Sequence, residues 1–480
     1  MNPAVVRTRM APSPTGELHI GSLRTLLFSF AYAKKYSGQF IIRIEDTDQK
    51  RYVPGAEKRI LKDISDCGLS WDEGPDIGGP YGPYTQTERL PIYQKYITEL
   101  LNHGFAYYCF CTPERLEEMR TTQKALKQIP KYDRHCLNLS PAEIKQKLAD
   151  HVPYVIRLKV PDNQVISFVD SVRGQIKINT NEIDDQVLIK SDGIPTYHFA
   201  VVVDDYLMHI THIFRGEEWI SSTPKQVILY NYFGWPLPQF THLTVLLDPS
   251  HSGKMSKRHG SVFVRQFLDD GYLPEALLNF LMLLGWNPGT DQEVFSLAEF
   301  IQAFSTEHLH KQQPVFDRKK LDYFNGLYLR QKTDDQLVSL LTPYLPSAST
   351  DTLRLLVPLI KERIITLKDA VTLTHFLFHQ ISLSRDLFVS QKLDLLLSAQ
   401  MLSEARELLD QQTDWQPSNL QPKLIDLIKS HDWPTGKFFM AFRLAVAGSS
   451  ITPPIVESLP LLTKPVALAR LMHAIDVLRS

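Results

Sequence analysis

Cysteine is scarce in this sequence. Its 480 residues include four cysteines, at positions 67, 109, 111 and 136. A secreted protein of this length that depended on disulfide bonds would carry more of them, so the composition excludes a disulfide framework. A reducing, cytoplasmic environment is therefore expected.

Neither sign of charge is in excess. The chain has 52 lysine and arginine residues against 53 aspartate and glutamate residues, which gives a formal net charge of -1. This balance excludes a protein that attracts nucleic acid through a global positive field. Any such contact must depend on local basic patches.

Long apolar runs are also missing. The most apolar stretch, EALLNFLMLLGW at residues 275–286, is too short and too interrupted to span a bilayer. No targeting segment, fixed-period repeat or low-complexity tract is recognisable, and no membrane association is expected. Because 43% of the residues are hydrophobic, the chain can fill several cores, and its length predicts three to five compact domains.

What the chain does contain is an alternation of expected strands and helices near its start. Residues 5–10 and 39–46 are expected as strands on either side of an amphipathic helix over 20–36. This order predicts a parallel β-α-β unit with a right-handed crossover, which is half of a nucleotide-binding fold. A similar alternation returns at residues 185–248, so we expect one sheet that is split by an insertion.

The rest of the chain differs in character. Residues 100–190 contain three of the four cysteines and β-like runs, and are expected to form a separate α+β lobe. After about residue 330, amphipathic helical patterns dominate. LPSASTD, at residues 345–351, is the clearest linker-like stretch.

The stretch PSPTGELHIGSL, at residues 12–23, joins a turn to the expected start of a helix. Free backbone N–H groups and the positive end of the helix dipole make such a junction a ready site for phosphate. His19 lies at the junction and is expected to face the anion, while Gly16 turns the chain and Gly21 allows a close approach. The alternative is an ordinary strand-to-helix connection with His19 as a helix-entry residue.

A second stretch, SGKMSKRHG at residues 252–260, follows the expected last strand of the sheet. It places Lys254, Lys257 and Arg258 between two glycines, which predicts a flexible basic loop. Taken alone, such a charge cluster is usually a solvated surface.

Together, the two stretches resemble the paired signatures of class I aminoacyl-tRNA synthetases, in which a histidine-isoleucine-glycine motif and a lysine-methionine-serine-lysine motif close on ATP from two sides. The resemblance narrows to the glutamyl-tRNA synthetase family of bacterial or organellar type. It is carried, in order, by RMAPSPTGELHIGSLRT, IRIEDTDQKRYVPGAEKRI, WDEGPDIGGPYGPY, SDGIPTYHFAVVVDD, FRGEEWISSTPK, KMSKRHG and PVFDRKKLDYFNG. One departure is visible, because the fullest signature has histidine at both ends of the tetrad, whereas this chain has His19 and Ser22.

The resemblance implies a multidomain α/β protein of the class I synthetase type. A Rossmann-type parallel sheet is split by an α+β insertion and followed by an all-α anticodon-binding region. Residues 1–100 and 191–247 would be the two halves of the catalytic domain, and 101–190 the inserted lobe that binds the acceptor end of tRNA. Residues 248–330 would form the KMSKR loop and stem-contact region, and 331–480 the anticodon-binding region.

The implied reaction is activation of L-glutamate with ATP and Mg²⁺, followed by transfer to the 3' end of tRNA(Glu). Four residues are implied as catalytic, because they would stabilise the charge that develops on the phosphates: His19, Lys254, Lys257 and Arg258. The further ATP-binding residues implied are Gly16, Gly21, Ser22, Glu218, Leu247, Met255 and Ser256.

The resemblance also assigns the glutamate pocket. Arg9 and Arg215 are implied as readers of the carboxylate, since an arginine fork donates two parallel hydrogen bonds to a carboxylate but can accept none from an amide. Glu45 would pair with the substrate ammonium, and the remaining pocket residues would be Ala11, Ser13, Tyr197 and Val201. A relative with asparagine at position 201 would bind the amino acid there, whereas valine offers no side-chain hydrogen bond. Structural ion pairs or core packing are the alternative for each position.

Cys109, Cys111 and Cys136 resemble the zinc site that some of these synthetases carry in the inserted lobe. There, a histidine two residues after the third cysteine completes the tetrahedron, but this chain has Asn138 at that position. His135 is adjacent to Cys136, and neighbouring ligands rarely fit one tetrahedral site. Structural zinc and three reduced thiols both stay open.

The expected partners are tRNA(Glu) and, in a non-discriminating form, tRNA(Gln), bound by a cytoplasmic monomer. Arg363, Lys437 and Arg443 are candidate contacts for the anticodon, although solvated helix faces explain these cations equally well. Glutaminyl specificity is disfavoured by the paired arginines, and a truncated relative that glutamylates a modified tRNA base lacks the helical region. Two further alternatives remain. A small-molecule nucleotidyltransferase would lack the helical C-terminal region, and a synthetase-derived RNA-binding protein would have lost the catalytic residues.

Overall fold

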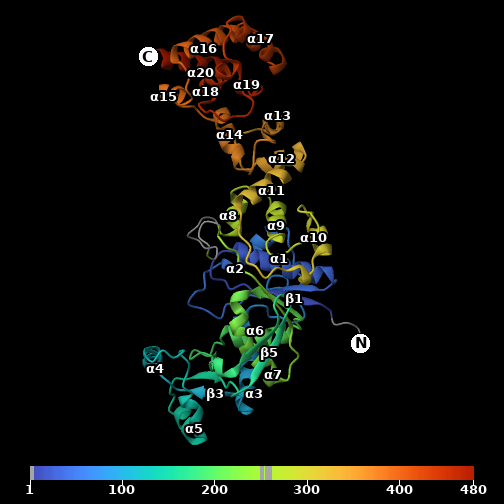
Figure 1. Cartoon of the computed structure of the whole chain (residues 1–480), viewed down its shortest axis with the longest axis vertical. Helices are drawn as coiled ribbons and strands as arrows, with labels where there is room; N and C mark the ends of the chain where they lie inside the picture. The colour runs from blue at the N-terminus through green and yellow to red at the C-terminus, as the bar shows by residue number, and fades with distance from the viewer. Residues whose placement is uncertain (1–4, 249–252, 254–261) are drawn as a thin grey trace. The chain divides into compact units, whose positions relative to one another are not determined.

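A computed structural model of the chain describes residues 5–248, 253 and 262–480 (Figure 1). The chain forms two compact units, of which the first comprises residues 1–267 with 278–317 and the second residues 268–277 with 318–480. The length predicts three to five domains, which is more than these two units. One reason is that part of the inserted region shares a sheet with the segments that flank it. The domain boundaries proposed at residues 100, 190, 247 and 330 stay predictions.

The first unit is built on parallel strands from both halves of the split fold. β1 (Arg7–Met10) pairs in parallel with β2 (Gln39–Ile42), and β8 (His212–Gly216) pairs in parallel with β9 (Gln239–Leu243). The two pairs meet where the Thr211 N–H donates to the Arg7 carbonyl at 2.9 Å. The predicted parallel sheet with an insertion is therefore confirmed.

Helix α1 (Ile20–Lys35) makes the crossover between β1 and β2, as predicted. It buries an apolar stripe that includes Leu23 and Leu27, and its last turn carries Lys34 and Lys35, where cations complement the helix dipole. The crossover places the start of α1 directly after the carboxyl end of β1. This is the edge at which open α/β sheets bind their ligands.

The inserted region is only partly a separate lobe. β3 (Ala106–Cys109), β4 (Val155–Leu158) and β7 (Val187–Ile189) form an antiparallel sheet of their own. The hairpin of β5 (Val165–Asp170) and β6 (Gly174–Asn179) instead extends the parallel sheet, because β5 pairs with β9. The prediction of a separate lobe is wrong for this hairpin. The alternating residues of β5 bury Phe168 in the same core as Phe240 of β9, which holds the hairpin in the sheet.

Short helices complete the first unit. They are α2 (Ala56–Asp66), η1 (Gln86–Arg89), α3 (Leu90–Asn102), α4 (Pro113–Ala125), η2 (His135–Asn138), α5 (Pro141–Ala149), η3 (Thr180–Glu182), α6 (Tyr197–Leu207), η4 (Glu217–Ser222), α7 (Thr223–Phe233), α10 (Leu297–Ala303) and η6 (Thr306–His308). Two more, α8 (Val264–Asp269) and α9 (Pro274–Met282), each contribute residues to both units.

The second unit is helical, as predicted. It contains α11 (Arg318–Gln331), α12 (Asp334–Leu341), α13 (Thr350–Ile360), α14 (Asp369–Phe378), α15 (Arg385–Ser390), α16 (Leu395–Asp410), α17 (Pro417–Ser430), α18 (Thr435–Ala447), α19 (Leu459–Leu462) and α20 (Lys464–Arg479) (Figure 1). Helices α16, α17, α18 and α20 enclose one apolar core. None of the helices in the described part of the chain has both the length and the apolar character needed to cross a membrane.

The linker-like stretch at residues 345–351 is not a linker between domains. It connects α12 to α13 within the second unit. Its serine and threonine residues serve the helix start, since the Ser349 hydroxyl accepts a hydrogen bond from the Thr352 N–H at 3.1 Å. The polar composition therefore marks a helix N-cap.

Two adjacent aspartates on α6 tie the first unit together. Asp204 accepts hydrogen bonds from Arg89 Nε at 2.7 Å, the Tyr93 hydroxyl at 2.8 Å and Gln86 Nε2 at 2.9 Å. Asp205 instead faces Arg9 of β1 and Arg43, which follows β2. These groups are buried, so each carboxylate compensates cations that water does not reach.

This burial predicts that Asp204→Ala lowers the free energy of unfolding of the first unit by about 3–5 kcal/mol, because the Arg89 guanidinium would be left buried without its partner. The measurement is urea unfolding in a background in which Trp415 and Trp433 of the second unit are replaced by phenylalanine, so that tryptophan fluorescence reports the first unit. The matched control is Asp48→Ala, which removes the exposed ion pair with Arg51. It should cost about 1 kcal/mol or less. Equal losses in the two variants would contradict the assignment.

Candidate active site

The junction of β1 and α1 shapes a site for an anion. His19 is the N-cap of α1, and its Nδ1 accepts a hydrogen bond from the Gly21 N–H at 3.0 Å. Since Nδ1 is the acceptor, the neutral imidazole carries its proton on Nε2, the atom that can donate to a phosphate. A Cβ at position 21 would lie 3.3 Å from His19 Nδ1, which is a tight contact, so glycine there leaves room for the imidazole.

Gly16 has a different role in this loop. Its φ of +153° lies in a region that side chains other than glycine rarely adopt, and a Cβ built there meets no atom within 4 Å. Glycine is thus needed for the turn of the chain, and the space beside it is open.

The chain just after the second motif pairs with the first motif. The Ile20 N–H donates to the Val262 carbonyl at 2.8 Å, and the Val264 N–H donates to the Leu18 carbonyl at 2.9 Å. The segment that follows the basic motif in the chain therefore pairs with the segment that carries His19. The predicted residues Lys254, Met255, Ser256, Lys257 and Arg258 lie outside the described residues.

The residues predicted to read glutamate come together from four separate segments. Arg9 lies in β1, Glu45 follows β2, Tyr197 begins α6 and Arg215 lies in β8. Tyr197 interacts electrostatically with the other three. Arg9, Glu45 and Arg215 are each no more than 5% exposed, so the cluster is shielded from water.

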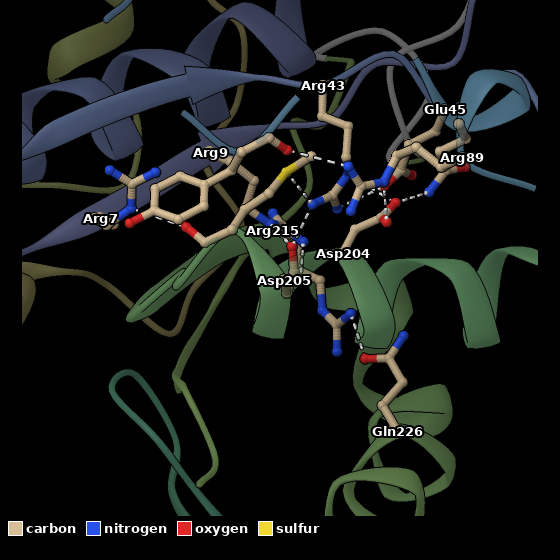
Figure 2. A network of polar contacts seen from close by, with 12 residues as sticks. Arg7, Arg9, Arg43, Glu45, Arg89, Asp204, Asp205, Arg215 and Gln226 are labelled. Carbon is tan, nitrogen blue, oxygen red and sulfur yellow. Dashed lines mark hydrogen bonds and ion pairs between the residues drawn. The ribbon is translucent and has the colours of Figure 1, made fainter. Parts of the chain in front are cut away.

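The two arginines of this cluster are held in different ways. Arg9 presents its fork to a carboxylate of the protein, with Nε 3.1 Å from Asp205 Oδ1 and Nη2 3.3 Å from Asp205 Oδ2 (Figure 2). Arg215 instead donates to three neutral acceptors: His242 Nε2 at 3.0 Å, Gln226 Oε1 at 2.8 Å and Thr223 Oγ1 at 2.7 Å. Among the described residues, no carboxylate lies within ion-pairing distance of Arg215. Arg215 is thus a buried cation that forms no direct ion pair in the described part of the chain, although the charge of Asp205 acts favourably on it.

Glu45 is held between cations of the same network. Arg43 Nη2 lies 2.9 Å from Glu45 Oε1, and Arg43 Nη1 lies 2.8 Å from Asp205 Oδ1 (Figure 2). Burial raises the pKa of Glu45 to about 7, although the charges of Arg43 and Arg9 oppose this shift. Arg43 therefore orients Glu45 without fully stabilising its charge.

The comparisons with known proteins agree with this arrangement. Residues 5–323 match the family of class I tRNA synthetases (E and Q), catalytic domain, and residues 336–475 match an anticodon binding domain. The chain belongs to the class I tRNA synthetase family.

Relatives match over nearly the whole length of the chain. A protein named glutamate--tRNA ligase from Borreliella burgdorferi is 42% identical over 98% of this chain and 99% of its own. One with the same name from Acinetobacter baylyi is 41% identical over 98% of this chain and 94% of its own. A crystal structure of a glutamate tRNA ligase from Elizabethkingia meningosepticum, in complex with its amino acid, matches with a TM-score of 0.87 at 35% identity, over 98% of this chain and 99% of that one. The predicted family and fold class are confirmed.

Other site residues predicted from the synthetase resemblance lie around the same edge of the sheet. Ser22 is in the first turn of α1, and the Ser22 N–H donates to the His19 carbonyl. Leu247 forms a bridge with Val315, and Glu218 lies in η4 after β8. Ala11 and Ser13 belong to the loop after β1, whereas Val201 is 1% exposed within the apolar core of α6. Their contacts with ATP or the amino acid stay predictions.

Sequence reasoning missed the residues that hold the synthetase site in place. They are Arg43, Asp205, Thr223, Gln226 and His242. A signal was present for the first two, because each is a charged residue adjoining an aliphatic run, in FIIRIED and FAVVVDD. Their partners lie up to 196 residues away in the chain, and spacing alone does not identify them.

The three cysteines of the inserted region come together. The sulfur atoms of Cys109, Cys111 and Cys136 lie within 4.8 Å of one another. The Tyr132 hydroxyl lies between them, 3.3 Å from Cys109 Sγ, 3.4 Å from Cys111 Sγ and 3.0 Å from the Cys136 nitrogen. Hydrogen bonds with Cys136, Tyr132 and Arg157 lower the pKa of Cys109 to about 4. His135 is exposed and is not part of this group.

Two of the predicted anticodon contacts also approach each other. Arg443 of α18 is half-buried, and burial together with the charge of Arg363, which follows α13, lowers the pKa of Arg443. The two positive charges destabilise each other, so an anion bound beside them would be stabilising. Lys437 is exposed at the start of α18.

The raised pKa of Glu45 predicts how glutamate binding depends on pH. If Glu45 pairs with the substrate ammonium, binding requires its ionised form, which is lost as the pH falls through about 7. The KM for glutamate is therefore expected to rise roughly tenfold between pH 8 and pH 6, while the KM for ATP changes less than about twofold. Steady-state kinetics of wild type and Glu45→Gln measure this, and the variant should bind glutamate weakly at every pH. A flat wild-type KM over this interval would remove Glu45 from the ammonium site.

Proposed function

We propose that the protein is a cytoplasmic, monomeric glutamate--tRNA ligase. It activates L-glutamate with ATP to glutamyl-adenylate and transfers the glutamyl group to the 3' end of tRNA(Glu), releasing AMP and pyrophosphate. The observation that carries the proposal is the buried Arg215, which has no direct carboxylate partner among the described residues, beside Arg9, Glu45 and Tyr197 in a class I synthetase fold. This cluster offers cationic donors to a side-chain carboxylate and an anionic acceptor to the ammonium of the same molecule.

Selectivity for glutamate follows from this charge pattern. Glutamine has nearly the same shape, but its amide brings no negative charge to Arg215 and presents N–H groups that a guanidinium cannot accept. Arg9 is already bound to Asp205 through Nε and Nη2 and donates to the Phe214 carbonyl through Nη1, so it contributes mainly positive potential. Arg215 is therefore the principal reader of the substrate carboxylate.

Activation begins with attack of the α-carboxylate of glutamate on the α-phosphorus of ATP. Pyrophosphate leaves, and negative charge builds on the phosphate oxygens. No general base is required, because the nucleophile is already ionised. His19, oriented by the Gly21 N–H so that Nε2 can donate, is assigned to this charge, together with Lys254, Lys257 and Arg258 of the basic motif. Mg²⁺ bound to the triphosphate neutralises part of the same charge.

Discrimination between amino acids tests the proposal. ATP-pyrophosphate exchange is measured with glutamate and with glutamine, each with and without tRNA(Glu) or tRNA(Gln), for wild type and Arg215→Lys. We expect exchange with glutamate only, dependent on tRNA, and a KM for glutamate at least about 100-fold higher in the variant because the bidentate fork is lost.

The outcomes test amino-acid specificity, dependence on tRNA and choice of tRNA separately. Equal use of glutamine, or an unchanged KM in Arg215→Lys, would overturn the proposed specificity. Exchange without RNA would remove the dependence on tRNA. Stable glutamylation of tRNA(Gln) would mark a non-discriminating enzyme.

A structural zinc ion fits the cysteine cluster of the inserted region. In a tetrahedral site with Zn–S bonds of about 2.3 Å, sulfur atoms lie roughly 3.8 Å apart, so the three thiols need little movement to share one ion. A fourth position would stay open beside the three thiols, because Asn138 stands where relatives with this site have histidine; the Tyr132 hydroxyl lies nearest to it, 3.3 and 3.4 Å from two of the sulfur atoms. The ion would fix the turn at η2 against β3.

Zinc analysis by mass spectrometry tests this assignment. Protein purified under reducing conditions is expected to hold about one zinc ion per chain, and Cys136→Ser is expected to lose it. Cys67→Ser is the matched control, because Cys67 is also buried but has no other cysteine beside it. Wild type that contains no zinc and takes up none would show that the cluster is three reduced thiols.

The helical region is assigned to the anticodon of tRNA. Arg363, Arg443 and Lys437 would contact the bases or phosphates of the anticodon loop, whose unpaired bases are accessible. The mutual repulsion of Arg363 and Arg443 in the free protein supports this role, since a bound anion would relieve it.

A further inference from the structure

The side chain that orients Arg215 belongs to the neighbouring strand. In the parallel pairing of β8 with β9, Arg215 is directly opposite His242. Arg215 Nε lies 3.0 Å from His242 Nε2, and both side chains are buried. The contact therefore arises from the sheet register and not from a flexible loop.

The other nitrogen of His242 is bound to a carboxylate. His242 Nδ1 lies 2.7 Å from Asp170 Oδ2, and Asp170 is the last residue of β5. The carboxylate is itself held by backbone N–H groups of Val172, Arg173 and His242 at 3.0, 2.9 and 2.9 Å. These three bonds leave Asp170 little freedom to move away from the imidazole.

The two contacts determine the protonation of His242. Arg215 Nε only donates, so His242 Nε2 must present its lone pair, and the ring proton must lie on Nδ1, facing Asp170. Burial lowers the pKa of His242, against the effect of Asp170, and the charges of Arg215 and Arg173 act in the same direction as burial. The imidazole is therefore neutral at pH 7.

We infer that His242 is a positioning residue for Arg215, and that Asp170 maintains the His242 tautomer in which Nε2 accepts from Arg215. The inference rests on the proposed function, because it concerns the residue that reads glutamate. Its physical basis is the difference between the partners of Arg215 and those of Arg9. Arg9 is paired directly with the carboxylate of Asp205, whereas Arg215 donates to the neutral groups of His242, Gln226 and Thr223, which orient it and leave more of its charge for a substrate.

Substitutions at position 242 separate the two hydrogen bonds of the imidazole. In His242→Gln, the amide oxygen reaches the place of Nε2 and can still accept from Arg215. In His242→Asn, the shorter amide reaches only the side of Asp170. The matched control is His212→Phe, because His212 is also a shielded histidine, on β8, that bonds to Tyr32 and Thr211 outside this cluster.

The readout is the KM for glutamate, ATP and tRNA(Glu) in pyrophosphate exchange. We expect His242→Asn to raise the KM for glutamate at least tenfold, with the KM for ATP and tRNA within twofold of wild type. His242→Gln should restore the glutamate KM to within about threefold, and His212→Phe should leave all three unchanged. A role limited to folding would move all three constants together and would not be rescued by glutamine, and that result would overturn the inference.

A spectroscopic measurement keeps the inference testable even where His242→Asn fails to fold. In protein labelled with ¹⁵N-histidine, the His242 signal, assigned by its loss in His242→Gln, is expected to show the neutral form protonated on Nδ1 at pH 7. A form protonated on Nε2, or on both nitrogens, would overturn the inference. Arg215→Lys separates failure of the positioning role from failure of the proposed function. If Arg215→Lys raises the glutamate KM and His242→Asn does not, only the positioning role of His242 is overturned. If Arg215→Lys has no effect, the proposed function itself is overturned.

Discussion

The buried ion pairs of helix α6 are the interaction on which the rest of the first unit depends. Asp204 and Asp205 are adjacent, so their side chains leave the helix in different directions and, apart from Arg43, which approaches both, reach different partners. Asp204 holds η1 and α3 through Arg89 and Tyr93, while Asp205 holds Arg9 and Arg43 at the ends of the first two strands. The two aspartates of α6 thus link the helices packed around them to the residues of the proposed glutamate pocket.

This arrangement also explains why a pocket for a small, charged amino acid can be dry. Burying several charges is unfavourable unless nearly every one has a partner. Here the pairs Arg9 with Asp205, Arg43 with Glu45 and Asp205, and Arg89 with Asp204 meet that condition. Among the described residues Arg215 is the exception, because it has no direct carboxylate partner, and this is the basis of its proposed preference for an anionic substrate.

Much of the site could be predicted from the sequence, because its reacting groups lie in short motifs. His19, Gly16 and Gly21 follow from the turn and the helix start, and the order of strands and helices predicts the parallel sheet. The supporting residues could not be predicted in this way. Whether Asp205 faces Arg9 depends on how α6 packs over β1, and whether Asp170 reaches His242 depends on which strand accepts β5 as a neighbour. Both are long-range outcomes of packing that leave no local pattern.

The position of β5 shows how one such outcome affects chemistry. The sequence pattern of residues 165–179 is that of a two-stranded hairpin, and it predicts nothing about its neighbours. Because β5 joins the parallel sheet beside β9, its last residue is placed behind His242, and the inserted region supplies part of the support of the catalytic core. An insertion that formed a fully separate lobe could bind RNA equally well, but it could not orient Arg215, the residue proposed to read the amino acid. The shared sheet therefore makes the geometry of the glutamate pocket dependent on the same segment of chain that is expected to meet the acceptor end of tRNA.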